Sequence, residues 1–177
     1  MLCRQFFAVG GGVAVGSGDA VGRGRIDVES AEEMYQAARE AFPDSDAAIL
    51  CAAVADYRPE QVAERKIKRE EKGEMTLRLV PNQDIAASLG AMKREGQILV
   101  GFALETDDGV SHAESKLRRK NLDFIVLNSL RDPGAGFRCD TNKIAILDNA
   151  GTRTSFPLKS KREVASDIVD RLVTCLR

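Results

Sequence analysis

The stretch Ala47-Ala-Ile-Leu-Cys-Ala-Ala-Val54 is a nearly continuous apolar run, and it decides the fold class. It is short enough for a β-strand, and because no polar residue alternates with the apolar ones, we expect both of its faces to be buried. A helix is predicted directly before it. That helix begins at the capping box Ser30-Ala-Glu-Glu33, ends before Pro43, and has an apolar face made of Met34, Ala37, Ala38 and Ala41.

Alternating strands and helices are predicted along the rest of the chain. Apolar runs at residues 98–102, 123–127 and 144–147 have the length of buried strands. Helical spacing of apolar residues occurs at residues 82–94, in a segment capped by Asp107, and after the capping box formed by Ser160 and Glu163. This alternation indicates a three-layer α/β fold in which helices cover a doubly wound, mostly parallel (Rossmann-like) sheet.

A charged segment interrupts the alternation. Residues 66–69 and 75–79 flank Glu70-Glu-Lys-Gly73, which has the character of a turn. We therefore predict a β-hairpin inserted between two elements of the sheet, and we assign it to residues 66–80.

Length, composition and charge exclude several classes of protein. The 177 residues suit one domain, and 44% hydrophobic with 30% charged residues is typical of a globular chain rather than a disordered one. The formal net charge of −1 argues against a general nucleic-acid binder, which needs a basic face. No apolar run approaches the roughly 20 residues that span a bilayer. We expect neither nucleic acid nor membrane as a partner.

The cysteines carry no metal-binding pattern. Cys3, Cys51, Cys139 and Cys175 are far apart in sequence, and the chain has a single histidine. This spacing argues against the usual zinc clusters and is typical of reduced thiols, so we expect a cytoplasmic protein.

Polar residues follow the predicted strands, at the edge where open parallel sheets bind ligands. Asp56 follows the first strand, Glu105 and Thr106 follow the second, and Asn128 follows the third. Taken singly, each is better explained as a helix cap or a loop residue.

Two groups of cations suit an anionic ligand. Lys66, Lys68 and Arg69 belong to the predicted hairpin, whereas Lys116 and Lys120 share one helix face at i, i+4 spacing. A nucleoside triphosphate needs such donors around its phosphates. By spacing alone, however, a solvated charged surface explains these residues better.

The glycine-rich start has no established nucleotide fingerprint. Gly10-Gly-Gly-Val-Ala-Val-Gly16 misses G-x-G-x-x-G by one position and lacks the Walker spacing, which disfavours an NAD(P)-binding Rossmann oxidoreductase. Residues 1–24 also contain too little leucine and isoleucine for a signal peptide, so none is expected.

Several linked motifs carry a family resemblance. They are Ala52-Ala-Val-Ala-Asp-Tyr-Arg-Pro59, Lys66-Ile-Lys-Arg69, Gly101-Phe-Ala-Leu-Glu-Thr106, Lys116-Leu-Arg-Arg-Lys-Asn-Leu-Asp123 and Gly136-Phe-Arg-Cys-Asp-Thr-Asn142. In this order they resemble the phosphopantothenoylcysteine synthetases, whose domain is often fused behind a flavin-dependent decarboxylase. The resemblance runs from about Arg25 to the C-terminus. It outweighs the alternative explanations given above for the single residues.

The resemblance implies a ligase of coenzyme A biosynthesis. In that family the carboxylate of 4′-phosphopantothenate attacks the α-phosphate of CTP, which gives an acyl-cytidylate, and the amine of cysteine then displaces CMP. CTP, 4′-phosphopantothenate and cysteine are thus the expected ligands, with Mg²⁺ accompanying CTP and no flavin in this chain. A homodimer through the hairpin and a decarboxylase domain or chain are the expected protein partners.

The same resemblance assigns roles to individual residues. Lys66 is the expected catalytic residue, on a flap that closes over the reactants. No residue is assigned as a protein ligand of a metal. The expected nucleotide-binding residues are Leu50, Cys51, Ala52, Asp56, Lys66, Gln83, Asp84, Ile85, Ala86, Phe102, Lys116 and Lys120.

One departure from the family pattern lies at the start of the chain. The family domain opens with a strand, a glycine-rich turn and an Arg-Tyr-Ile-Ser-Asn-x-x-Ser-Gly-like stretch, and nothing in residues 1–24 resembles it. We therefore divide the chain into a divergent segment, residues 1–24, and a synthetase-like domain, residues 25–177. A truncated or diverged chain, an exposed sheet edge and low activity are expected. A nucleotide-binding module that lacks catalysis and needs a partner chain is the alternative.

Overall fold

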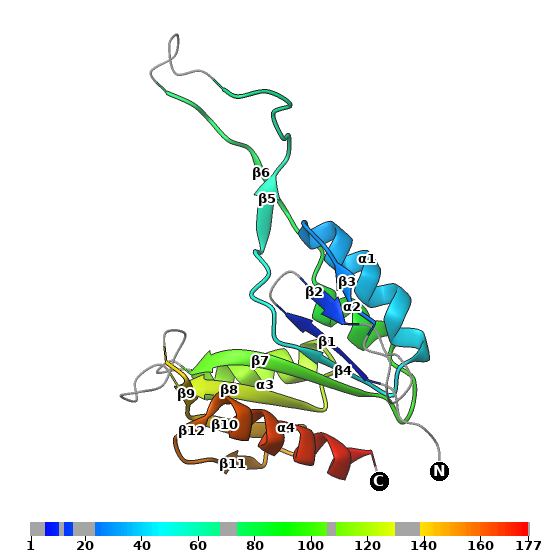
Figure 1. The fold of residues 1–177 in the computed structure, drawn as a ribbon, viewed down its shortest axis with the longest axis vertical. Coiled ribbons are helices and arrows are strands. Elements are labelled where there is room, and N and C mark those ends of the chain that lie inside the picture. Colours follow the sequence, from blue (N-terminus) through cyan, green and yellow to red (C-terminus); the bar gives the residue numbers. More distant parts are fainter. Residues whose placement is uncertain are drawn as a thin grey trace.

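The computed structural model describes residues 6–10, 13–15, 24–67, 74–105, 109–129 and 139–176. Its main sheet contains β1 (Phe6–Gly10), β2 (Val13–Val15), β3 (Ile26–Asp27), β4 (Ala47–Leu50), β7 (Ile98–Glu105), β8 (Phe124–Ser129), β10 (Ile144–Asp148) and β11 (Arg153–Ser155). The spatial order is β11-β10-β8-β7-β4-β1-β2-β3 (Figure 1). The central strands β1, β4, β7 and β8 are parallel, and antiparallel strands flank them on both sides.

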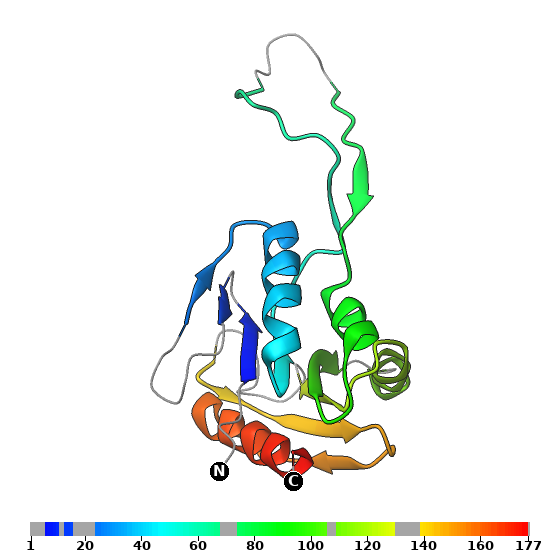
Figure 2. The ribbon, with the colours of Figure 1, turned by 90° about the vertical axis from the view of Figure 1, so that its right-hand side faces the viewer.

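Helices cover both faces of this sheet, which confirms the predicted three-layer α/β fold (Figure 2). The helices are α1 (Ala31–Ala41), the short 3₁₀ helix η1 (Phe42–Asp44), α2 (Ile85–Met92), α3 (Gly109–Arg119) and α4 (Lys161–Cys175). One core cluster joins α1, α2 and α3 to the sheet, and a second cluster joins α4 to its other face. Alternate residues along β7 and β8 enter different clusters, as strands buried on both faces require.

Both predicted capping boxes are confirmed. The Ser30 hydroxyl accepts a hydrogen bond from the backbone N–H of Glu33 at 3.2 Å, and the Ser160 hydroxyl accepts one from that of Glu163 at 3.3 Å. The glutamate side chains bond back to the serine N–H groups. The helix α1 ends before Pro43, as predicted, because the ring removes a backbone donor.

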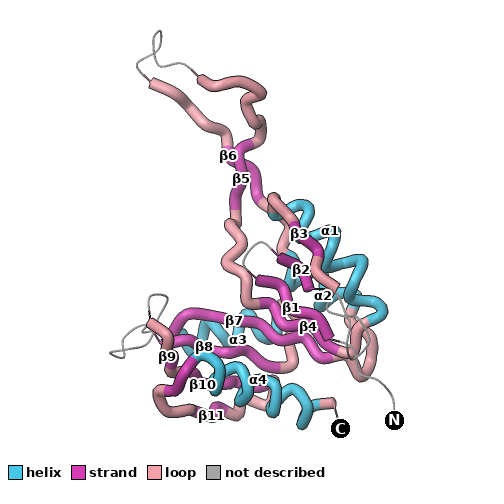
Figure 3. The backbone as a smooth tube through the Cα atoms, viewed as in Figure 1, coloured by secondary structure: helices cyan, strands magenta, loops and turns pink. Residues whose placement is uncertain are grey.

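The bounds of several elements differ from the predicted ones. The strand predicted through Val54 ends at Leu50, because the chain leaves the sheet there and runs towards an inserted segment (Figure 3). The helix predicted over residues 82–94 covers only Ile85–Met92, with Asp84 as its N-cap. In contrast, β7 continues to Glu105, because it pairs with β8 as far as Ser129. The predicted cap Asp107 lies outside the described residues.

The expectation that the chain lacks an opening strand is wrong. Phe6–Gly10 forms β1, which pairs in parallel with β4 on one side and antiparallel with β2 on the other. The sheet is therefore not exposed at β4. The pairing of Gly10 with Val13 also shows that the glycine-rich segment connects two antiparallel strands. A dinucleotide fingerprint instead connects a strand to a helix, so the structure gives the oxidoreductase alternative no support.

A long arm projects from the sheet (Figures 1 and 3). We define it as residues 57–81, of which 57–67 and 74–81 are described. Its paired strands are β5 (Tyr57–Pro59) and β6 (Leu79–Pro81), at the root where the arm leaves the body. The predicted hairpin strands thus lie too far from the root of the arm, since residues 60–67 and 74–78 are not in strands. A separate small sheet pairs β9 (Thr141–Asn142) with β12 (Lys159–Ser160).

A close contact fixes α2 against the end of α3. A methyl group on Gly90 would lie 2.0 Å from the carbonyl oxygen of Lys120, so only glycine fits this position of α2. The Asn121 amide then donates to the Gly90 carbonyl at 2.9 Å, with Asn121 itself at φ 51°. One turn along, Lys93 binds the Asp123 carboxylate at 3.0 Å. We call this contact the Gly90 junction.

Candidate functional site

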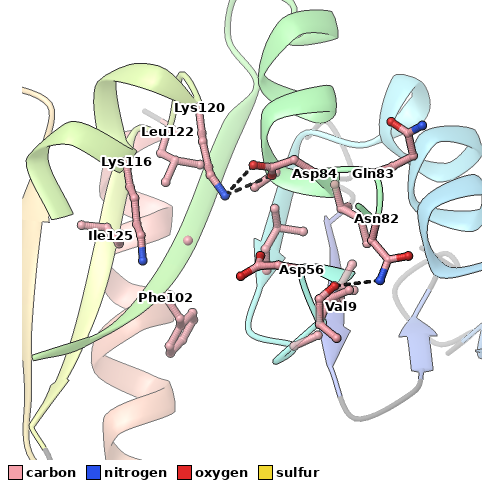
Figure 4. A pocket seen from close by; sticks show the side chains of 17 residues that line it. Val9, Asp56, Asn82, Gln83, Asp84, Phe102, Lys116, Lys120, Leu122 and Ile125 are labelled. Carbon is pink, nitrogen blue, oxygen red and sulfur yellow. Dashed lines mark hydrogen bonds and ion pairs between the residues drawn. The ribbon is translucent and has the colours of Figure 1, made fainter. Parts of the chain in front are cut away.

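A pocket opens beyond the carboxyl end of β4, the edge at which parallel sheets bind ligands, and beside Gly101 and Phe102 in the middle of β7 (Figure 4). The walls come from the segment after β4, the start of α2, the strand β7 and the end of α3. The lining residues are Val9, Leu50, Ala52, Val54, Ala55, Asp56, Asn82, Gln83, Asp84, Ile85, Ala86, Gly101, Phe102, Lys116, Lys120, Leu122 and Ile125.

The structure brings together all of the predicted nucleotide-binding residues except Cys51 and Lys66. Leu50, Ala52 and Phe102 supply apolar surface to the pocket, whereas Asp56 and Lys116 supply charge. Their common position is an observation, but their roles remain predictions.

Cys51 does not line the pocket and instead bonds to β1. Its backbone N–H donates to the Val9 carbonyl at 2.9 Å, and its thiol donates to the same oxygen at 3.2 Å. Burial raises the pKa of the Cys51 thiol, with a smaller opposing effect from its backbone hydrogen bond. The thiol is therefore protonated at neutral pH and serves to tie β1 to the end of β4.

Lys66 lies on the arm and is exposed, away from the residues that line the pocket. Lys68 and Arg69 lie outside the described residues. The two groups of cations predicted from the sequence are thus separated: the α3 lysines face the pocket, and the described hairpin lysine does not.

An ion pair crosses one side of the pocket. The Lys120 ammonium contacts both oxygens of Asp84, at 2.9 and 3.0 Å (Figure 4). Asp84 also caps α2 by accepting the Ala87 N–H at 3.0 Å. Burial acts to raise the pKa of Asp84, but the Ala87 N–H and the Lys120 ammonium outweigh it, so this pKa lies below its usual value. The carboxylate is thus ionised and holds Lys120 at the pocket.

Lys116 extends into the pocket one helical turn before Lys120 (Figure 4). Because Asp84 offsets the charge of Lys120, Lys116 and the free N–H groups at the start of α2 give this part of the pocket its net positive character. Asp56 projects from the wall across the pocket from Lys116 (Figure 4). The arrangement suits a ligand with an anionic group at one end and hydrogen-bonding groups at the other.

Sequence reasoning missed several residues of the pocket. Val9 belongs to the segment that was expected to contribute nothing, and its position depends on pairing with a strand far along the chain. Gly101 stands in a quoted motif, and a methyl group there would lie 2.7 Å from Leu122 Cδ1. Asn82 directly precedes the predicted nucleotide-binding residues at the start of α2, which was a usable signal.

Other predicted edge residues lie elsewhere. Asn128 accepts a hydrogen bond from the Asn142 amide at 3.1 Å and does not line the pocket. Thr106 and the side chain of Glu105 are outside what the structure describes. No cluster of three metal-ligating side chains occurs among the described residues, and no described helix is long and apolar enough to cross a membrane.

Comparison with known proteins adds to this geometry. The sequence profile of the DNA/pantothenate metabolism flavoprotein C-terminal domain (DFP) matches residues 4–176. The chain belongs to the DFP family. The family likeness inferred from the motifs is thereby confirmed. Its expected start near Arg25 is wrong, however, because the DFP match begins at residue 4 and so includes β1.

Individual relatives share much of this chain. A cysteine/cysteine sulfinic acid decarboxylase from an unknown prokaryotic organism is 57% identical over 149 residues, which cover 84% of this chain and 41% of that protein. The coenzyme A biosynthesis bifunctional protein CoaBC of Bacillus subtilis strain 168 is 43% identical over 147 residues, which cover 83% of this chain and 36% of that protein. The chain thus spans about two fifths of the length of these curated DFP relatives.

A solved structure agrees with the family assignment. The crystal structure of the C-terminal domain of CoaBC matches with a TM-score of 0.68 and 34% identity, over 85% of this chain and 65% of that one. The DFP fold described above, with its central parallel strands, is therefore the one shared with this relative.

Proposed function

We propose that the chain is the nucleotide-binding part of a phosphopantothenate–cysteine ligase of coenzyme A biosynthesis. The observation that carries the proposal is the pocket in which Lys116 and Lys120 face Asp56 at the carboxyl edge of the sheet. Its DFP relatives include proteins named for coenzyme A biosynthesis, which supports the pathway. Under this proposal CTP activates the carboxylate of 4′-phosphopantothenate as an acyl-cytidylate, and cysteine then forms the amide.

The pocket suits the triphosphate and the base of CTP. The α3 lysines and the start of α2 suit the triphosphate, because positioned cations and free N–H groups stabilise phosphate oxygens. The apolar surfaces of Leu50, Ala52 and Phe102 suit the base. Mg²⁺ accompanies the triphosphate in this proposal, held mainly by phosphates and waters, as this cation usually is. Asp56 is the lining carboxylate that fits it, because Asp84 is already bound to the α2 cap and to Lys120.

Lys66 is proposed as the catalytic lysine, carried by the arm. Charge develops first on a phosphoryl group and then on an acyl carbon, and a positioned ammonium stabilises both. Because Lys66 lies outside the pocket in this structure, the proposal requires the arm to close over the reactants.

A homodimer through the arm is part of the proposal. The arm exposes apolar side chains that no described part of the chain covers, and Val62 is 85% exposed. Apolar surface of this kind marks an interaction site. The exposed residues are Tyr57, Val62, Ile67, Met75, Leu77 and Leu79.

Replacing Lys120 by alanine is expected to weaken CTP binding about 10- to 150-fold, because one charged contact to a phosphate is worth about 1.5–3 kcal/mol. Isothermal titration with Mg²⁺–CTP measures the change. Arg118→Ala is the matched control, since Arg118 is exposed on the same helix, pairs with Glu114 and does not line the pocket. Equal affinities of Lys120→Ala and the parent chain would contradict the assignment. A parallel titration with ATP tests the preference for CTP.

A nucleotide-binding module without catalysis remains the second candidate. The observation that favours it is the position of Lys66 outside the pocket. CTP binding without release of pyrophosphate, in every assembly of the chain with its substrates and partner domains, would establish that candidate.

A further inference from the structure

The wall of the pocket that carries Asp56 is an irregular segment. Residues 51–56 connect β4 to β5 and belong to no helix or strand. In the described part of the chain, residues 52–56 make two hydrogen bonds to other segments, and Asn82 makes both. Its backbone N–H donates to the Asp56 carbonyl at 2.8 Å, and its side-chain amide donates to the Ala55 carbonyl at 2.8 Å.

A neighbouring arginine fixes the orientation of the Asn82 side chain. The Arg58 guanidinium donates to Asn82 Oδ1 at 3.1 Å and to the Pro81 carbonyl at 2.9 Å. Because the guanidinium has no acceptor, the oxygen of the carboxamide has to face Arg58. The NH₂ group is then directed at Ala55, as the dashed line in Figure 4 marks.

Asn82 therefore lies where three parts of the molecule meet. It follows β6 at the root of the arm, precedes Gln83 and the helix cap Asp84, and bonds across to the segment after β4. It is half-buried and lines the pocket. A change in the position of the arm root therefore acts on the Asp56 wall through both hydrogen bonds of Asn82, in addition to the covalent link from Asp56 to Tyr57.

We infer that Asn82 is a positioning residue that holds the peptide between Ala55 and Asp56 and thereby aims the Asp56 carboxylate into the nucleotide pocket. Asn82 acts through Asp56, and Arg58 keeps the amide in the productive orientation. This inference rests on the proposed function for the identity of the nucleotide, and it adds a role that the family resemblance did not assign.

A double-mutant cycle on CTP affinity tests how Asn82 acts. Asn82→Ala and Asp56→Ala are each expected to weaken Mg²⁺–CTP binding about tenfold, the loss of one hydrogen bond to a charged group. The double variant should bind no more weakly than the weaker single variant, because both changes remove the same contact. The inference would be overturned if the double variant lost affinity by the product of the two single losses, or if either single variant bound CTP as well as the parent chain.

Ser88→Ala is the matched control for this cycle. Ser88 is half-buried on α2, its hydroxyl bonds to the Tyr35 hydroxyl at 3.4 Å, and it does not line the pocket. Its removal should leave CTP affinity unchanged within error. A loss equal to that of Asn82→Ala would show that loosening α2, rather than aiming Asp56, causes the effect, and would overturn the inference.

A second measurement needs no nucleotide and separates this inference from the proposed function. Backbone ¹⁵N order parameters for residues 52–56 should fall from about 0.85 to below about 0.6 in Asn82→Ala, while those of β7 and β8 stay high. Asn82→Asp should loosen the same residues, because it keeps the acceptor for Arg58 but cannot donate to Ala55. Unchanged order parameters in both variants would overturn the inference even if CTP binds, whereas a parent chain that fails to bind CTP would overturn only the proposed function.

Discussion

Replacing Gly90 by alanine is expected to destabilise the fold by about 3 kcal/mol or more. The added methyl carbon would lie 2.0 Å from the Lys120 carbonyl oxygen and 2.8 Å from the Lys120 carbonyl carbon. These are backbone atoms, so α2 or the end of α3 has to move, and the hydrogen bond from Asn121 to the Gly90 carbonyl is strained with them. Overpacking costs about 1–3 kcal/mol where side chains can adjust, and more where they cannot.

Helix propensity alone predicts that Gly90→Ala stabilises the fold, so the experiment distinguishes the two explanations. Glycine to alanine inside a helix normally gains about 1 kcal/mol, and Ala91→Gly at the next, exposed position should lose about that much. Urea unfolding of both variants measures the free energies. A Gly90→Ala variant as stable as the parent would show that the α2–α3 spacing is not fixed by this contact. Reduced CTP affinity in the same variant is also expected, because Lys120 moves with its carbonyl.

A polypeptide of these 177 residues is expected to form phosphopantothenoylcysteine at least about 10²–10³ times more slowly than a complete synthetase. The family resemblance assigns an asparagine and several phosphate donors to an opening stretch that is not found in this sequence. Loss of a single preorganised donor to a developing oxyanion costs about 10²–10³ in rate, and several are missing here. Purified chain with CTP, Mg²⁺, 4′-phosphopantothenate and cysteine, followed by release of CMP and pyrophosphate, provides the measurement.

A graft gives this assay its control. Joining the opening stretch of a CoaBC relative to the chain should restore turnover, and Lys66→Gln in that fusion should remove it again while CTP still binds. Turnover by the unextended chain at the rate of an intact synthetase would contradict the prediction. It would mean that residues 1–24 or a partner chain supply the donors.

Local signals in the sequence predicted the local structure well. The two capping boxes at Ser30 and Ser160 act within one helical turn, so they could be identified without knowledge of the fold. The i, i+4 spacing of Lys116 and Lys120 likewise placed both lysines on one face, and the structure places that face at the pocket. The strand ends were predicted less well, because they depend on how far a neighbouring strand continues.

Long-range contacts were not predictable in the same way. Gly90 is an ordinary helix glycine until the Lys120 carbonyl is placed beside it, and the role of Asn82 depends on Arg58 and Ala55. Val9 enters the pocket only because β1 pairs with β4, although its glycine-rich surroundings suggested no strand. Only the family motifs, which carry long-range information, brought the strand-end residues and the α3 lysines together in advance.

The parallel centre of the sheet has a consequence for how the chain folds. Phe6 pairs with Ala47, Ala47 pairs with Ile98, and Val100 pairs with Phe124, so no two neighbouring central strands are joined by a short turn. Each pairing closes a long loop before any hydrogen bond forms, which gives the domain a high contact order and slow folding. During synthesis β1 emerges before β4 and has to wait for it, and the β1–β2 hairpin is the local structure that can protect it meanwhile.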